Sequence, residues 1–439
     1  MGGTIQLNRS FDLKEARMKK NLKYTVLILI VLTAVLIPAA VFADGVKVPD
    51  HVYENSDQAI EATKDSHETA FYFAHDMDTG QKITGKCGDN TTYTVYGQIT
   101  WEQYNENWYS SSEERYLAVI SGTGPTYDYT WDTKLDKWSD VREIIVEDGV
   151  TTIGDNFFNM INTENRIRKV TLPEGLLSIG EEAFCNSEFM ESINLPDTIT
   201  DIGYQAFFCC RSLESLHIPE GLTRIQEDSF YGLESITSID IPDSVTTIER
   251  GGFQHCEKLA AVKWGKGLKK IGVDAFAACG FTELSIPDHV TSIGDGAFQV
   301  CLKLKKVKVS KAFTKIPEEA FYRCEKLTTI TFPAASKVTT ISSGAFEYCR
   351  ALKTITLPKN VTKIKDESFK YCSKLTTIKL LSKKPPKLQS YCVFVGDRIF
   401  AKSRTKKMTF KCPNMSKKNK KAFRKYLKKP SISFYGKVK

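Results

Sequence analysis

Cysteine is the reactive residue type with the most regular spacing in this chain. Of the 12 Cys, seven recur at intervals of about 23 residues: Cys210, Cys256, Cys279, Cys301, Cys324, Cys349 and Cys372. Leu233 takes the same position in another interval, which favours a column of buried thiols that act as small apolar groups. Disulfides between neighbouring intervals are the alternative, although stacked side chains would point the same way. Zinc sites need closely spaced Cys or His, so we predict no metal site.

The other reactive residues form no recognisable catalytic set. Six His are scattered along the chain, and no phosphate-binding glycine loop is present. Glu102 with Glu113 or Glu114 could act as paired carboxylates of a glycan hydrolase, which we keep as a less favoured alternative. We therefore predict no catalytic residues and no cofactor.

The Cys intervals belong to a longer repeat of 23 residues, L-x-x-I-x-L-P-x-x-V-x-x-I-x-x-x-A-F-x-x-C-x-x, found in ten copies. The second isoleucine recurs in each copy: Ile153, Ile179, Ile202, Ile225, Ile248, Ile271, Ile293, Ile316, Ile341 and Ile364. The phenylalanine recurs as well: Phe158, Phe184, Phe207, Phe230, Phe253, Phe276, Phe298, Phe321, Phe346 and Phe369. Identity at fixed spacing predicts a solenoid whose core contains Ile202, Phe207, Ile225, Phe230, Ile248, Phe253, Ile271, Phe276, Ile293 and Phe298.

Each unit predicts a short strand, a turn, a second extended piece and one helical or 3₁₀ turn. The first segment alternates with period two, and proline then ends the strand. The A-F-x-x-C segment has apolar residues at i, i+1 and i+4, which is consistent with the helical turn. Trp264–Gly265 replaces L-P in one copy, and two extra residues lie near Ala334–Ala335 in another. We interpret these departures as tolerated surface variation.

The L-x-x-I-x-L-P…I-G…A-F-x-x-C pattern resembles the leucine-rich repeats of the BspA-like family of bacterial surface proteins. The resemblance covers about half of the chain. It implies an α/β solenoid of about ten coils with a parallel sheet on one face, a β-rich N-terminal cap and a small strand-helix C-terminal cap. It also implies an extracellular binding or adhesion protein rather than an enzyme.

The N-terminal residues 1–43 read as a signal peptide, with Met18 as the plausible true start. A basic segment precedes the apolar stretch Tyr24–Ala39, and Val41 and Ala43 fit signal-peptidase cleavage before Asp44. An uncleaved membrane anchor is the alternative, since about 20 apolar residues can cross a bilayer. Either reading places the bulk of the chain outside the cytoplasm, secreted or at the cell surface.

Residues 44–140 lack the repeat and are rich in Tyr, Trp and Thr. Strands are predicted at Thr92–Gly97 and Tyr116–Ser121. We expect this module to cover the first coil of the repeats, which span residues 141–380.

Residues 381–439 form the predicted C-terminal cap, with a strand at Met408–Lys411 and a helix at Ser416–Lys429. Ala422, Phe423, Tyr426 and Leu427 would form the buried face of the helix. From Leu375 onward there are 20 Lys and Arg and one acidic residue, Asp397, although the whole chain has a net charge of +9. This basic end could bind anionic wall polymer, or it could be only a soluble exterior. Export makes nucleic acid an improbable partner.

The outward residues of successive strands form the candidate ligand surface, here called the ladder face. Its members are Thr171, Asn194, His217, Asp240, Lys263, Ser285, Lys308, Thr331 and Thr356. They are polar and variable, and solenoids bind extended partners on such faces. The sequence thus favours contact with extracellular proteins or glycans such as host matrix, mucin or other cells. A solvated face without a ligand, in a structural wall protein held by its basic tail, is the alternative.

Overall fold

The computed structural model describes residues 52–53, 58–59, 62, 70–73, 84–104, 107–111, 116–128, 141–159, 166–389, 408–427 and 436–439. The signal-peptide prediction for residues 1–43 lies outside them. The chain divides into two compact units, Met1–Asp50 and His51–Lys439. All described residues belong to the second unit. No helix in the described ranges has the length and apolar character that a membrane crossing requires.

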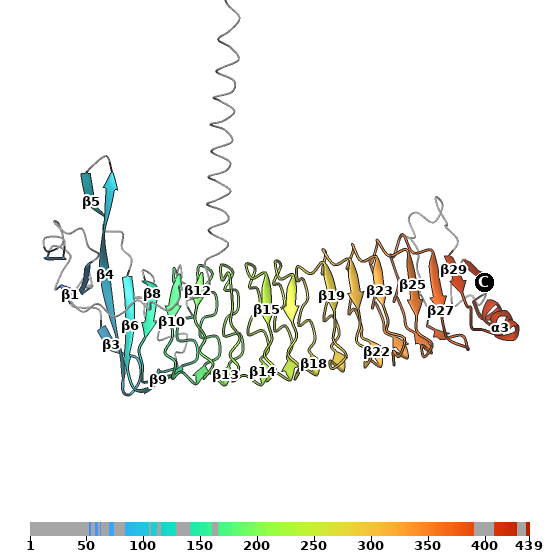
Figure 1. Cartoon of the computed structure of the whole chain (residues 1–439), viewed down its shortest axis with the longest axis horizontal. Coiled ribbons are helices and arrows are strands. Elements are labelled where there is room, and N and C mark those ends of the chain that lie inside the picture. Colours follow the sequence, from blue (N-terminus) through green and yellow to red (C-terminus); the bar gives the residue numbers. More distant parts are fainter. Residues whose placement is uncertain are drawn as a thin grey trace, which may run out of the picture. The chain divides into compact units, whose positions relative to one another are not determined.

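The repeats form a parallel β-solenoid with two columns of strands, and most coils contribute to both (Figure 1). The copy from Leu213 has a strand in the second column only. The first column comes from the L-x-x-I-x-L segments: β8 (Val141–Val146), β10 (Lys169–Thr171), β12 (Ser192–Ile193), β15 (Ser238–Asp240), β17 (Ala261–Lys263), β19 (Glu283–Ser285), β21 (Lys306–Lys308), β23 (Thr329–Thr331), β25 (Thr354–Leu357) and β27 (Thr377–Leu380). Two strands of the C-terminal cap, β29 (Met408–Lys411) and β30 (Gly436–Val438), continue it beyond the repeats. These strands confirm the predicted parallel sheet.

The second column comes from the segments with the invariant isoleucine, which also pair in parallel, and it is extended by β7 before the first copy and by β28 after the last. Its strands are β7 (Gly124–Pro125), β9 (Val150–Ile153), β11 (Ser178–Ile179), β13 (Asp201–Ile202), β14 (Arg224–Ile225), β16 (Thr247–Ile248), β18 (Lys270–Ile271), β20 (Ser292–Ile293), β22 (Lys315–Ile316), β24 (Thr340–Ile341), β26 (Lys363–Ile364) and β28 (Lys387–Leu388). Isoleucine pairs with isoleucine, as in Ile248 with Ile271. Leu388 pairs with Ile364, so this column continues past the ten copies seen in the sequence.

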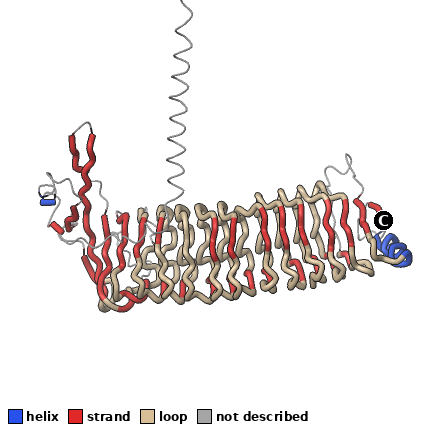
Figure 2. Tube along the Cα trace, viewed as in Figure 1, coloured by secondary structure: helices blue, strands red, loops and turns tan. Residues whose placement is uncertain are grey.

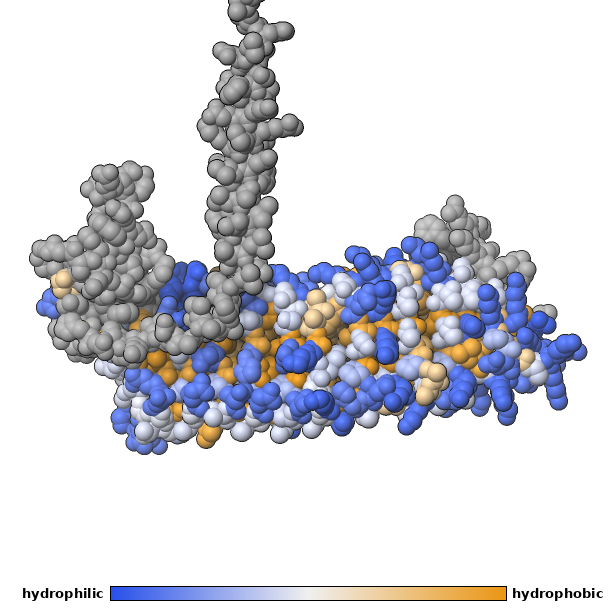
Figure 3. Space-filling model, viewed as in Figure 1, coloured by the Kyte–Doolittle hydropathy of each residue, from blue (hydrophilic) through white to orange (hydrophobic). Residues whose placement is uncertain are grey.

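The phenylalanines form one uninterrupted stack through the interior. Neighbouring rings from Phe158 to Phe369 lie 5.0–5.9 Å apart between centroids, with interplanar angles of 2–21°. All ten are fully buried, and the ten repeat isoleucines are at most 6% exposed. Figure 3 shows the apolar residues as a band along the array, bordered on both long edges by hydrophilic residues.

The A-F-x-x-C segment is a run of turns, so the predicted helical or 3₁₀ turn is wrong (Figure 2). The physical reason is a left-handed residue on each side of the phenylalanine: Glu182 (φ 52°) and Asn186 (φ 60°) flank Phe184. Such residues cannot continue a right-handed helix. The N–H groups instead donate to the next coil, as from Phe184 to the carbonyl of Ala206 at 2.8 Å.

The N-terminal end of the first column is extended by a β-rich cap. Its strands are β1 (Val52–Tyr53), β2 (Ala70–Phe73), β3 (Thr84–Lys86), β4 (Thr91–Tyr104), β5 (Asn107–Ser111) and β6 (Tyr116–Gly122). β4 and β6 contain the two predicted strands and pair antiparallel, and β6 pairs parallel with β8. The cap therefore continues the sheet instead of leaving the edge of β8 open.

The C-terminal end is closed by β29, β30 and helix α3 (Lys417–Leu427). The Ser416 hydroxyl caps the helix by accepting the Asn419 N–H at 3.2 Å. Phe423 and Leu427 are buried, but Ala422 is exposed, so the predicted apolar face is narrower. The Tyr426 hydroxyl donates to the Leu388 carbonyl at 2.7 Å and accepts the Leu388 N–H at 3.2 Å. It thereby occupies the last edge of the second column.

The buried position of Ile271 leads to a stability prediction. Ile271→Asp should lower the free energy of unfolding by at least about 4 kcal/mol, because it removes apolar packing and buries an unpaired charge. Guanidinium denaturation followed by circular dichroism measures the change. Lys270→Asp is the matched control, since Lys270 is exposed in the same strand; it should change stability by no more than about 0.5 kcal/mol. Equal effects of the two variants would contradict the proposed packing.

Candidate functional site

The ladder face lies on the first column, and the structure exposes most of its residues. Asn194, His217, Asp240, Lys263, Ser285, Lys308 and Thr331 are exposed, whereas Thr171 and Thr356 are half-buried. Register brings several together: Asp240 lies opposite Lys263, and Lys308 lies between Ser285 and Thr331. The face is thus a row of polar side chains spaced by one coil.

Four ladder residues use their side chains within the protein. The Asn194 amide donates to the Leu172 carbonyl at 2.9 Å and accepts its N–H at 2.8 Å. His217 Nε2 lies 2.8 Å from Asp197 Oδ1, and Lys263 Nζ lies 2.8 Å from Asp240 Oδ2.

Ser285, Lys308 and Thr331 differ, because their side chains have no hydrogen-bond partner among the residues that the structure describes. These three, here called the free triad, can be satisfied only by water or by a partner.

Two recesses open at the carboxyl ends of first-column strands. The first, here called the Trp pocket, has a volume of about 410 Å³ and extends over three coils. Its lining residues are His217, Ile218, Glu220, Asp240, Ile241, Pro242, Asp243, Lys263, Trp264 and Lys266. Three ladder residues therefore converge on it.

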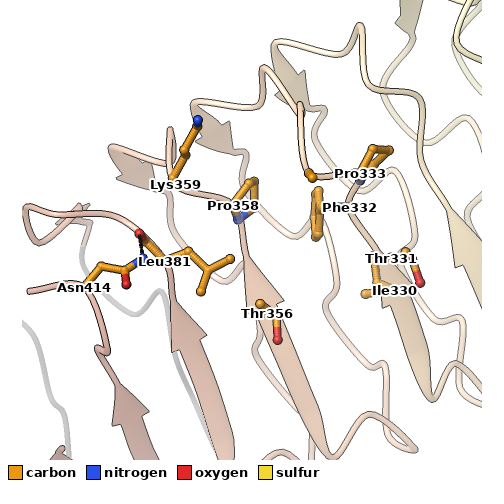
Figure 4. Close-up of a pocket in the computed structure, with 10 residues that line it drawn as sticks. Ile330, Thr331, Phe332, Pro333, Thr356, Pro358, Lys359, Leu381 and Asn414 are labelled. Carbon is orange, nitrogen blue, oxygen red and sulfur yellow. Dashed lines mark hydrogen bonds between the residues drawn. The ribbon is translucent and has the colours of Figure 1, made fainter.

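The second recess, the Phe pocket, has a volume of about 360 Å³ and lies next to the C-terminal cap (Figure 4). Phe332, Pro333, Pro358 and Leu381 give it apolar walls, and Thr331 and Thr356 contribute hydroxyls. The Asn414 amide, drawn in Figure 4, donates to the Leu381 carbonyl at 2.7 Å.

Both pockets surround an aromatic residue at the leucine of the L-P pair. The other eight copies place an aliphatic residue there, at most 3% exposed: Val146, Leu172, Leu195, Ile218, Ile241, Ile286, Val309 and Leu357. Trp264 and Phe332 pack against the same core but stay partly exposed, because an indole or phenyl ring exceeds the space of an aliphatic side chain. The replacement of L-P by Trp264–Gly265, interpreted above as surface variation, is the sequence signal for the first pocket. Phe332 was not singled out from the sequence.

The repeat cysteines are structural donors. In seven coils, the cysteine thiol donates a hydrogen bond to the backbone carbonyl of the phenylalanine in the preceding coil, with Sγ–O distances of 3.0–3.5 Å. The donors are Cys210, Cys256, Cys279, Cys301, Cys324, Cys349 and Cys372. All described cysteines are free and buried. Burial raises the pKa of the thiols of Cys301 and Cys372 to about 12, which keeps them protonated and able to donate.

The remaining predicted reactive groups do not assemble. Glu113 and Glu114 lie outside the described residues, and of Glu102 only the backbone, in β4, is described. In the described part of the chain, no three His, Cys, Asp or Glu residues are grouped so that they could hold a metal ion.

The thiol column leads to a reactivity prediction. In a Cys392→Ser background, which removes the one Cys outside the described ranges, the native protein at about pH 8 should react slowly with Ellman's reagent. All described thiols are buried from the reagent, and the raised pKa of those such as Cys301 and Cys372 leaves little nucleophilic thiolate. All eleven remaining thiols should react once the chain is unfolded in guanidinium. A rapid reaction of even one thiol in the native protein would contradict this assignment.

Aspartates of the Pro-Asp turns accept hydrogen bonds from the next coil, and they predict that the stability of the fold falls at acid pH. Asp197 accepts the Glu220 N–H, Asp243 the Lys266 N–H and Asp288 the Lys311 N–H, each 2.7–2.9 Å away. These backbone bonds first, and the neighbouring His217, Lys266 and Lys311 side chains next, lower the pKa of the three carboxyls.

A carboxyl whose folded pKa is lowered stabilises the fold above its unfolded pKa of about 3.9, and this contribution is lost as pH falls through the folded value. Denaturation midpoints should therefore drop between about pH 4 and pH 2. Replacing Asp197, Asp243 and Asp288 together by Asn should flatten this dependence, because the amide oxygen accepts the same N–H without titrating. An unchanged slope in the triple variant would rule out these carboxyls as its source.

Comparison with known proteins addresses the repeats directly. The family described as BspA type Leucine rich repeat region (6 copies) matches residues 136–260, 269–393 and 340–439. No curated protein matches the chain.

Solved structures of similar fold include two leucine-rich repeat proteins. That from Bacteroides ovatus is 22% identical, with a TM-score of 0.49, and the match covers 78% of this chain and 97% of that protein. That from Eubacterium ventriosum is 21% identical, with a TM-score of 0.41, covering 73% and 98%.

A leucine rich cell surface protein from Faecalibacterium prausnitzii is also similar, at 23% identity and a TM-score of 0.37, covering 64% of this chain and 93% of that protein. At these identities and TM-scores, the solved structures carry no conclusion about this chain. The family match extends over more than half of the chain, from the first coil to the C-terminus. The chain belongs to the BspA-type leucine-rich repeat family.

Proposed function

We propose that this protein is an exported, cell-surface binding protein that contacts extracellular proteins or glycans through the ladder face. The observation that carries the proposal is the free triad: Ser285, Lys308 and Thr331 lie in register and exposed, and their side chains have no hydrogen-bond partner among the described residues. Polar groups held on a rigid sheet can meet a partner with little loss of conformational entropy.

The stacked interior supports this role. Leu284, Val307 and Ile330, the inward neighbours of the free triad, are 1–8% exposed, so the backbone that carries the triad is anchored in the core. Family membership is consistent with the same role, and a similar protein from F. prausnitzii is described as a cell surface protein. The binding energy of such a face comes from many coils acting together.

The proposal predicts that bulk and charge on the ladder face abolish binding. The chain from Asp44 to Lys439, tested by biolayer interferometry against matrix proteins, mucin and a glycan array, should show saturable binding to at least one of them. Ser285→Arg with Thr331→Arg should weaken that binding at least about tenfold, since both side chains flank Lys308 at the centre of the triad.

The matched control is Ser292→Arg with Thr314→Arg, which adds the same charge and size at exposed positions of the second-column side. The control should bind as the wild type does. No saturable binding of the wild type, or equal losses in the two variants, would overturn the proposal.

A second candidate function, attachment to an anionic wall polymer, is favoured by helix α3. Its 11 residues, KKNKKAFRKYL, include six basic and no acidic side chains, and all six basic residues are at least partly exposed. Such a helix attracts polyanions in a salt-dependent way. Retention of the protein on cell walls, compared with and without Leu375–Lys439 at rising salt, tests it; retention that does not change on deletion would remove it.

A further inference from the structure

We propose that the Trp pocket is a subsite for one neutral hexose ring of a glycan, with Trp264 as its stacking platform. The inference rests on the proposed binding function and names its ligand class and place. Three features carry it: the aromatic wall, the mixture of hydrogen-bonding groups and the balance of charge.

The aromatic wall forms because the Trp264 indole is larger than the aliphatic side chain that fills the equivalent space in most other copies. Trp264 occupies a position that is aliphatic and at most 3% exposed in every other copy except the one with Phe332. One part of its indole packs on Phe276, with ring centroids 5.5 Å apart and planes at 78°, while the rest lines the recess. Large aromatic faces bind the apolar C–H face of a sugar ring, and Trp combines such a face with an N–H donor.

The backbone next to Trp264 makes room for this arrangement. A Cβ at Gly265 would lie 2.0 Å from the carbonyl oxygen of Pro242, so neither the usual proline nor another side chain fits there. The strand pairing of the first column stops after β17, as it also does after β12 and after β23 within residues 166–389. The recess therefore lies at one of these breaks, where the backbone at Gly265 is close to that of the preceding coil.

The polar lining suits hydroxyl groups, which both donate and accept hydrogen bonds. Lys263 and Asp240 form one pair at 2.8 Å, and Lys266 and Asp243 form another at 3.0 Å. Each pair offers N–H donors beside a carboxylate acceptor. Glu220 has no side-chain hydrogen bond to the described residues and supplies a further acceptor.

The charge balance selects against anions. The two lysines are matched by Asp240 and Asp243, and Glu220 leaves an excess of negative charge, with His217 already bonded to Asp197. An acidic sugar or a phosphate would meet this excess. A quaternary ammonium has no hydrogen-bond acceptor, so it would leave unused the remaining N–H groups of Lys263 and Lys266, which are not engaged by Asp240 and Asp243. A neutral hexose uses both donors and acceptors, and the volume of about 410 Å³ is in the range of small-ligand sites.

The test uses saturation-transfer difference NMR on the chain from Asp44 to Lys439. The probes are methyl glycosides of galactose, glucose, mannose and N-acetylglucosamine, with methyl sialoside and choline as contrasting ligands. We expect saturation of ring C–H protons for at least one neutral glycoside and none for the sialoside or choline.

Trp264→Leu should weaken that glycoside's binding at least about tenfold, because it removes the stacking surface. Leucine is the consensus residue of this position, so the variant retains the fold, which its thermal unfolding verifies. Phe332→Leu makes the same type of change in the Phe pocket and should leave the signal unchanged. Glu220→Gln should weaken binding less than Trp264→Leu, because the amide still accepts one hydrogen bond.

Each other result overturns the subsite: no signal from any neutral glycoside, preference for the sialoside or choline, or a signal that Trp264→Leu leaves intact. The experiments distinguish failure of the hexose subsite from failure of the proposed binding function of the ladder face. If macromolecules bind the ladder face while no glycoside binds, only the subsite is wrong. If a glycoside binds at Trp264 while the free-triad arginines have no effect on any partner, only the ladder-face proposal is wrong.

Discussion

Every coil of this protein must bury its apolar side chains against the same side chains of the coil before it. Phenylalanine stacks on phenylalanine at 5.0–5.9 Å, and isoleucine pairs with isoleucine in register. Backbone N–H groups on both sides of each phenylalanine from Phe184 to Phe346 also donate to the next coil. Because a change in one coil would leave two neighbours without their contacts, the inward positions tolerate almost no variation.

The cysteines follow from the same constraint. A phenylalanine carbonyl in the interior needs a donor, and a thiol supplies one while filling the space of a small apolar side chain. The copy with Leu233 shows that packing matters more than this bond, since the stack continues through Phe230 with no gap. Free thiols rather than disulfides are what this geometry uses.

The residue type can vary freely only at positions whose side chains lie outside the buried core. Exposed ion pairs such as Lys306 with Glu283 link neighbouring coils, but exposed pairs add little stability, so these positions can vary for other reasons. The aromatic residues Trp264 and Phe332 use that freedom at the rim of the core, where each is half inside and half available to a partner. The residues of the proposed Trp264 subsite thus lie next to the buried phenylalanine stack.

The sequence alone determined the solenoid, its inward isoleucines and phenylalanines and most of the C-terminal cap, because identity at fixed spacing shows directly which positions must meet their equivalents. It could not determine which atoms meet between coils. The left-handed residues around Phe184, the thiol-to-carbonyl bonds and the pairing of Leu388 with Ile364 depend on backbone angles and on groups distant in sequence.

The Trp pocket was likewise decided only by the tertiary structure. A tryptophan in place of a leucine is visible in the sequence, but its meaning depends on the size of the slot, on Phe276 behind it and on charged residues of two other coils. The 23-residue period identifies the positions that repeat. The proposed subsite depends instead on side chains that differ between three neighbouring coils, and the period does not show which of these lie together.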